Sequence, residues 1–96
     1  MTIRVYFYIN EINDLRTDAI FFGKEFSDDI TGYSHNIIIK NIGKNTNGYY
    51  ADYILQGNIR RNENDVAKIL EKDFSRIIRK VSINSKGYYK AYFKKE

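Results

Sequence analysis

Residues 37–55 read IIIKNIGKNTNGYYADYIL, and this stretch decides the class of fold. An apolar, β-branched start gives way to a segment dense in turn formers at 43–48, and an aromatic, apolar run returns at 49–55. Asn-Gly, here Asn47-Gly48, is typical of a tight β-hairpin. We therefore predict a strand over 33–42, a turn over 43–48 and a returning strand over 49–56.

Apolar residues at spacings of three and four predict a helix before the hairpin, within residues 11–26. Asn10 or Asn13 would cap its start. Gly23 disfavours a helix by about 1 kcal/mol relative to alanine, so a short helix followed by an extended segment over 19–23 is the alternative. Residues 27–32 contain polar residues and Gly32, and they predict a connection. The stripe consists of Ile12, Leu15, Ala19, Phe22 and Phe26.

A second helical pattern follows the hairpin, with Asn62 or Asn64 as its cap. Four cations would lie together on another face of this helix. A strand is expected to begin at Val81. The apolar stripe consists of Val66, Ile69, Leu70, Phe74, Ile77, Ile78 and Val81, and the cations are Lys68, Lys72, Arg76 and Arg79.

Both ends of the chain alternate as strands do, because successive side chains in a strand point to opposite faces. At the N-terminus, Arg4, Tyr6 and Tyr8 share one face; we call these residues the N-terminal stripe. Near the C-terminus a similar pattern follows a predicted turn at 84–87. We call its members the C-terminal stripe: Tyr88, Lys90, Tyr92 and Lys94.

This order predicts one α+β domain over residues 1–96, built as a two-layer sandwich. Two helices would cover one face of a mainly antiparallel sheet of four or five strands, in the ferredoxin-like βαββαβ arrangement. The first and last strands would be neighbours, which would join the two stripes into one surface. A winged-helix-like arrangement, with the C-terminal segment as a wing, is the alternative.

The 96-residue chain carries a net charge of +4, and the basic charge is unevenly distributed. Residues 1–59 hold five Lys/Arg and seven Asp/Glu, whereas residues 60–96 hold eleven and five. The chain has no cysteine, which excludes disulfides and thiolate metal sites. With no membrane-length apolar run and no signal-peptide pattern, we expect a cytoplasmic protein without a membrane partner.

Tyrosines interleaved with cations suit stacking on bases and gripping phosphates, so we expect a surface that binds nucleic acid, preferably single-stranded DNA or RNA. The competing interpretations are a tyrosine-rich protein interface, or a bias of composition toward Ile, Asn, Lys and Tyr. The expected binding residues are Arg4, Tyr6, Tyr8, Arg60, Arg61, Lys68, Lys72, Arg76, Arg79, Tyr88, Lys90, Tyr92 and Lys94.

We expect no enzyme activity, no cofactor and no metal. His35 is the only histidine, which excludes sites that need two. Metal-independent RNA cleavage by Lys, Arg, Tyr and one His is the enzymatic alternative, but no spacing in the sequence supports it. The residues at 49–55 also lack the glycine-aromatic pattern of an RNA-recognition motif.

In size and composition the chain resembles the small proteins of phages and mobile elements, including the anti-CRISPR class, whose members share no motif. The resemblance implies the alternative function, an inhibitor that binds a host protein or nucleoprotein complex. Exposed aromatic residues in a small domain also mark protein partners. Ile20 and Phe21, which lie off the first helical stripe, would then serve a partner or a homodimer.

Overall fold

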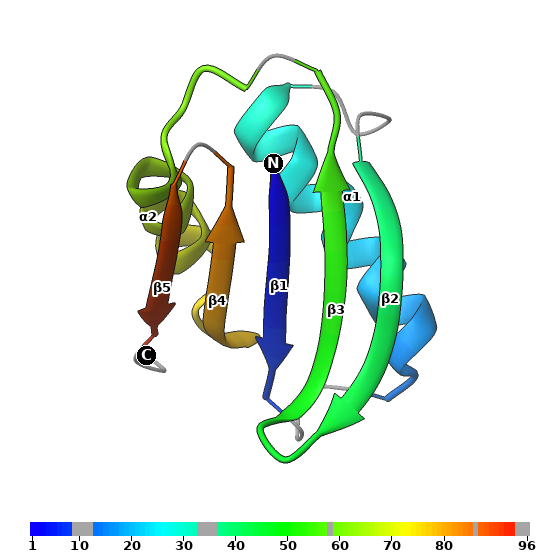
Figure 1. The fold of residues 1–96 in the computed structure, drawn as a ribbon. Coiled ribbons are helices and arrows are strands. Elements are labelled where there is room, and N and C mark those ends of the chain that lie inside the picture. Colours follow the sequence, from blue (N-terminus) through cyan, green and yellow to red (C-terminus); the bar gives the residue numbers. More distant parts are fainter. Residues whose placement is uncertain (9–12, 33–36, 58, 86, 94–96) are drawn as a thin grey trace.

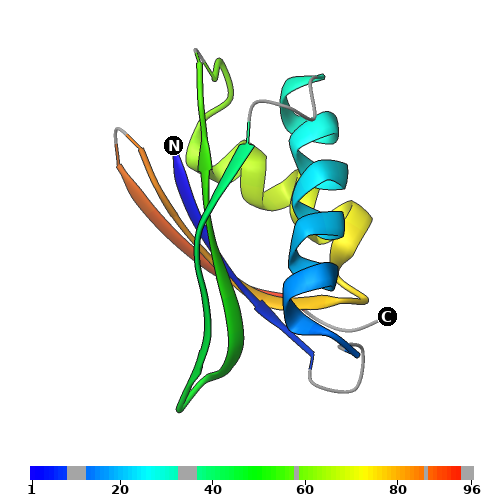
Figure 2. The same ribbon diagram turned by 90° about the vertical axis from the view of Figure 1, so that its right-hand side faces the viewer.

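A five-stranded antiparallel sheet is covered on one face by two helices (Figures 1 and 2). The computed structural model describes residues 1–8, 13–32, 37–57, 59–85 and 87–93. Neither of the two helices lies on the opposite face of the sheet, and we call it the open face. The elements are β1 (Thr2–Phe7), α1 (Leu15–Thr31), β2 (Ile37–Asn45), β3 (Gly48–Leu55), α2 (Glu63–Phe74), β4 (Ile78–Asn84) and β5 (Tyr88–Tyr92).

The strands lie in the order β2-β3-β1-β4-β5, with every neighbouring pair antiparallel (Figure 1). The first six elements form the expected ferredoxin-like βαββαβ sandwich, in which the helices share one face. β5 is an addition, because the chain folds back after β4 and extends the sheet by one edge strand. The prediction that the first and last strands are neighbours is wrong, since β4 lies between β1 and β5.

The core lies between the sheet and the helices. Ile3, Val5 and Phe7 of β1 are buried there, as their alternation predicts. Tyr53 of β3 is also fully buried, and its hydroxyl donates a hydrogen bond to the carbonyl oxygen of Ala19, 2.5 Å away. A Cβ atom added to Gly23 would lie 2.5 Å from Tyr53 Cε1. Glycine in the middle of α1 therefore leaves room for the Tyr53 ring, and the packing of this ring outweighs the cost of glycine in helix propensity.

Helix α1 is longer than predicted and continues through the expected connection at 27–32. Ser27 and Ile30 are buried, so the apolar stripe persists for another turn. The helix begins after Asp14, whose carboxylate accepts hydrogen bonds from the Arg16 and Thr17 N–H groups, so Asn13 is not the cap. It ends before Gly32, which has φ of +80° and can adopt this left-handed conformation without strain. Asn10 and Ile12 lie outside the described residues.

Helix α2 starts as predicted, because the Asn62 side chain accepts a hydrogen bond from the Asp65 N–H. It ends at Phe74, seven residues before the end of the predicted stripe at Val81. Residues 77–83 are rich in β-branched side chains, which favour a strand, and β4 begins at Ile78. The apolar residues of the predicted stripe after Phe74 therefore enter the core from a strand or turn. Arg79 consequently lies on β4, away from the helix cations.

The β2–β3 hairpin is confirmed, but its turn is shorter than the predicted 43–48. Asn45 pairs with Gly48, which leaves a loop of only Thr46 and Asn47. Residues 33–36, where the first strand was expected to begin, lie outside the described part of the chain. The pairing of β2 with β3 shifts register between Ile39 and Asn41, which leaves Lys40 as the extra residue of a β-bulge.

Candidate nucleic-acid interface

Charge is divided between the two layers of the molecule. The strands carry six basic residues and a single acidic one, whereas the helices carry eight acidic residues and four basic ones. The sheet layer is therefore cationic and the helix layer anionic. The strand residues are Arg4, Lys40, Lys44, Arg79, Lys80, Lys90 and Asp52; the helix acids are Asp18, Glu25, Asp28, Asp29, Glu63, Asp65, Glu71 and Asp73, and the helix bases are Arg16, Lys24, Lys68 and Lys72.

A row of alternating cations and tyrosines crosses the open face from β5 to β1. The backbone register places Lys80 opposite both Tyr92 of β5 and Tyr6 of β1. Lys80 Nζ lies 5.0 Å from the Tyr6 ring centroid and 5.2 Å from that of Tyr92. Lys90 Nζ lies 5.5 Å from the Tyr92 centroid. These distances are within the range of cation–π attraction, so the row is held by its own side chains.

Arg4 and Asp52 form an ion pair next to this row. Arg4 donates two hydrogen bonds to the carboxylate, at 2.6 Å from Nε and 2.9 Å from a terminal nitrogen. This hydrogen bonding raises the pKa of Arg4 against the lowering effect of burial. The guanidinium also lies over the Tyr50 ring, 4.3 Å from its centroid. Arg4 is therefore already paired, and the one acidic group of the strands is neutralised.

Tyr6 is only 4% exposed, although its side chain points to the open face. Its ring lies 6.0 Å from that of Tyr50 and is approached by Arg79 at 5.6 Å. Its hydroxyl accepts a hydrogen bond from Asn45 Nδ2 at 3.2 Å. Burial raises the pKa of Tyr6, but this hydrogen bond and the Arg4 charge outweigh it and lower the pKa. Contrary to our expectation, Tyr6 has no free ring face on which a base could stack.

Tyr8 also contributes little free surface. It is half-buried, and its hydroxyl donates a hydrogen bond to the Phe93 carbonyl oxygen at 3.3 Å. Arg4 and Tyr6 thus share the open face, but the side chains of the N-terminal stripe are occupied by contacts within the protein.

The C-terminal stripe is accessible. Tyr88 and Tyr92 are 65% and 64% exposed, more than any other large hydrophobic side chain in the described residues. Lys90 projects between them on the same face, since residues two apart in a strand point the same way. Hydrogen bonding between the two groups lowers the pKa of Tyr92 and raises the pKa of Lys90. Lys94, the last predicted member of this stripe, lies outside the described residues.

The remaining predicted cations do not join this surface as one group. Lys68 and Lys72 are exposed on α2, in the layer opposite the open face (Figure 2). Arg60 and Arg61 are exposed in the segment before α2, and Arg76 in the turn after it. Lys68 comes nearest, since it and Tyr92 both line a groove of about 300 Å³ between α2 and β5. The predicted site is therefore split between the two layers.

Two central residues of the open face, Lys80 and Tyr50, were missing from the predicted site. Lys80 was not predicted, because the apolar residues at 66–81 fit a helical spacing that obscured the start of β4. The β-branched run at 77–83 was the signal that could have revealed it. Tyr50 was visible as part of the hairpin, but only the register places it beside Tyr6.

In the described part of the chain, neither helix is long and apolar enough to cross a membrane. Nor do three His, Cys, Asp or Glu side chains gather closely enough to hold a metal ion in those ranges. We found no match to this chain among protein-family models, curated protein sequences or solved structures.

Proposed function

We propose that this protein binds single-stranded nucleic acid without catalysis, through the β5 side of the open face. Tyr88 and Tyr92 would stack on bases, while Lys90 and Arg79 would neutralise phosphates. Lys80 is buried between Tyr6 and Tyr92, so its charge would act on bound nucleic acid only from beneath these rings. The observation that supports this most is the position of Tyr88 and Tyr92, the two most exposed aromatic side chains of the described residues, on either side of Lys90 in the cationic layer. A cytoplasmic location, which fits the lack of cysteine, is part of the proposal.

The spacing of the two tyrosines suits an extended strand of nucleic acid. Four residues of β-strand separate their Cα atoms by about 13 Å, so the two rings would hold bases that are not adjacent. Lys90, midway between them, would then meet the backbone that links these bases. The ion pair with Arg4 leaves Asp52 without a free negative charge to repel phosphates.

Salt dependence tests the electrostatic half of the proposal. We expect mixed-sequence single-stranded DNA or RNA to bind at low ionic strength, with an affinity that falls steeply as salt approaches physiological concentrations. Fluorescence anisotropy of labelled oligonucleotides measures this directly. Absence of binding to both nucleic acids at low salt would refute the proposal.

Stacking is tested by replacing both exposed tyrosines. Because base–aromatic stacking contributes about 1–3 kcal/mol per base, we expect Tyr88→Ala with Tyr92→Ala to weaken binding by at least ten-fold. Phe21→Ala is a matched control, since Phe21 is 57% exposed but lies on α1 in the helix layer. Equal losses in both variants would show that the β5 tyrosines have no particular role.

The second candidate is an inhibitor that binds a host protein or nucleoprotein complex. Exposed apolar residues away from β5 favour it: Ile20 and Phe21 lie on α1, and Ile38 lies on the edge strand β2. A pull-down from host lysate that recovers no protein would weigh heavily against this candidate.

A further inference from the structure

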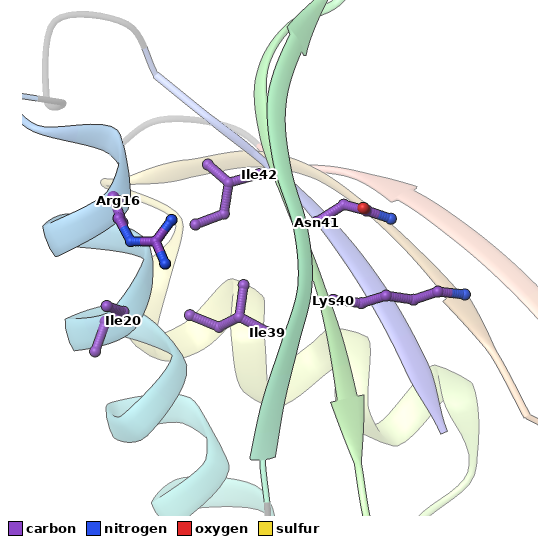
Figure 3. Close-up of a pocket in the computed structure, with 6 residues that line it drawn as sticks. All are labelled: Arg16, Ile20, Ile39, Lys40, Asn41 and Ile42. Carbon is purple, nitrogen blue, oxygen red and sulfur yellow. The ribbon is translucent and has the colours of Figure 1, made fainter.

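A groove of about 290 Å³ runs between helix α1 and the edge strand β2 (Figure 3). In Figure 3 the Arg16 side chain extends from the helix toward the strand, Ile20 lies on the same helix, and Ile39 and Ile42 extend from the strand toward the helix. The groove therefore brings three isoleucine side chains and one cation together beside accessible polar atoms. Its lining residues are Arg16, Ile20, Ile39, Lys40, Asn41 and Ile42.

The β-bulge at Lys40 shapes this groove. In a regular strand, residues three apart point to opposite faces, but the bulge lets both Ile39 and Ile42 face α1. The side chains of Lys40 and Asn41 point away from the helix. Since both residues nevertheless line the groove, their backbone forms part of its wall.

β2 is an edge strand, so its outer backbone groups have no partner strand. An extended peptide can pair with such an edge and use neighbouring pockets for its side chains. Ile20, which lines the groove from α1, is 40% exposed.

The charges at the start of α1 select the kind of peptide. Asp14 accepts hydrogen bonds from the N–H groups of Arg16 and Thr17, and Asp18 accepts them from the N–H groups of residues 13 and 14. Both carboxylates are therefore engaged in holding the helix start. Among the described residues, the Arg16 guanidinium has no carboxylate partner. It can form a charge-assisted pair with an acidic side chain that enters the groove.

We propose that this groove docks an extended segment of a partner protein. The segment adds a sixth strand beside β2, inserts an apolar side chain between α1 and β2, and places an Asp or Glu next to Arg16. The groove lies at the lower limit of ligand pockets, which span about 300–1,000 Å³, so it suits one or two side chains better than a cofactor. This surface is separate from the β5 side of the open face and does not depend on the proposed nucleic-acid binding.

Selection from a library of random peptides displayed on phage, with the full chain as bait, tests the proposal. We expect enriched peptides that alternate apolar with other residues and carry an Asp or Glu. Ile20→Asp and Arg16→Glu should each weaken binding of the enriched synthetic peptide at least ten-fold, while Lys24→Glu, a charge reversal at another exposed position of α1, should have little effect. Failure to enrich any peptide, or equal binding by all three variants, overturns the proposal.

Backbone pairing has its own readout. Bound peptide should slow amide hydrogen exchange in β2. N-methylation of the alternate peptide amides that face β2 should abolish binding of the peptide. Unchanged exchange in β2 overturns strand addition. Sedimentation of the free protein tests whether a second copy of this chain occupies the groove. Self-association that Ile20→Asp removes would identify the second copy as the occupant and overturn the proposal of a partner peptide.

Discussion

The two tyrosine-cation stripes are alike in sequence but opposite in accessibility. Arg4 and Tyr6 of the N-terminal stripe lie on β1, at the centre of the sheet, where β3 supplies Tyr50 on one side and β4 supplies Lys80 on the other. The C-terminal stripe lies on β5, which has a neighbour on only one side. Tyr6 is consequently buried by its neighbours, whereas Tyr92 is largely exposed. The same pattern is packed among its neighbours in one place and remains accessible in the other.

The largest effect should come from removing the central tyrosine. Tyr6→Ala deletes a buried ring and its contacts with Tyr50, Arg79 and Lys80, so we expect it to reduce the free energy of unfolding by about 3 kcal/mol. Urea denaturation followed by circular dichroism measures the loss.

Tyr92→Ala is the matched comparison for Tyr6→Ala. A largely exposed side chain contributes little to folding, so we expect a change within about 0.5 kcal/mol. Comparable losses in both variants would contradict the division of the stripes into a buried and an accessible one.

A smaller effect is expected when the Arg4–Asp52 pair is broken. Asp52→Asn removes a charged acceptor of two hydrogen bonds, which should cost about 1–2 kcal/mol of stability. The freed Arg4 charge should at the same time strengthen binding of single-stranded nucleic acid, so the N-terminal stripe would gain part of the function assigned to the C-terminal one.

Anisotropy titrations of Asp52→Asn beside Glu71→Gln distinguish this local effect from a general change in net charge. Both variants remove one negative charge, but Glu71 is exposed on α2, in the helix layer. Equal gains in affinity would show that Arg4 itself has no part in binding.

The smallest effect concerns the anionic helix layer. Burial, followed by the neighbouring Asp73, raises the pKa of Asp29 to about 6. A carboxyl group whose pKa is higher in the folded state than in the unfolded state binds its proton more tightly when the protein is folded. This contribution to stability is present at low pH and is lost as pH rises from about 4 through 6. Asp29→Asn should therefore raise Tm by a few degrees at pH 7.5, and this gain should disappear near pH 4.

Thermal unfolding across this pH range checks the prediction for Asp29. Asp73→Asn removes the neighbouring carboxylate and should flatten the same pH dependence. Neither substitution should weaken nucleic-acid binding, since both residues lie on helices. If both variants show the same pH profile as the unsubstituted protein, Asp73 does not raise the pKa of Asp29 and the prediction is wrong.

Much of the fold could be predicted because its signals are local. The hairpin around Asn47-Gly48, the Asn62 cap and the alternation of β1 all depend on residues close in sequence. The errors fell where spacing is ambiguous. Ile77, Ile78 and Val81 fit a helical stripe as well as a strand, and the pairing of β4 with β1 decides between them.

The candidate site was less predictable, because a strand pattern gives the direction of a side chain but not what surrounds it. Arg4 and Tyr6 do lie on one side of β1, yet Tyr50, Arg79 and Lys80 cover Tyr6 from strands that are distant in sequence.

The sequence by itself determined which side chains share a face, since that depends on the two-residue period of a strand and the near-four-residue period of a helix. Only the tertiary structure decided which of those faces are covered. Exposure depends on whether a strand lies at the centre or at an edge of the sheet, and strand order arises from pairing between distant segments. The division of charge between layers has the same origin, because acids spread along the chain gather only when both helices pack on one face.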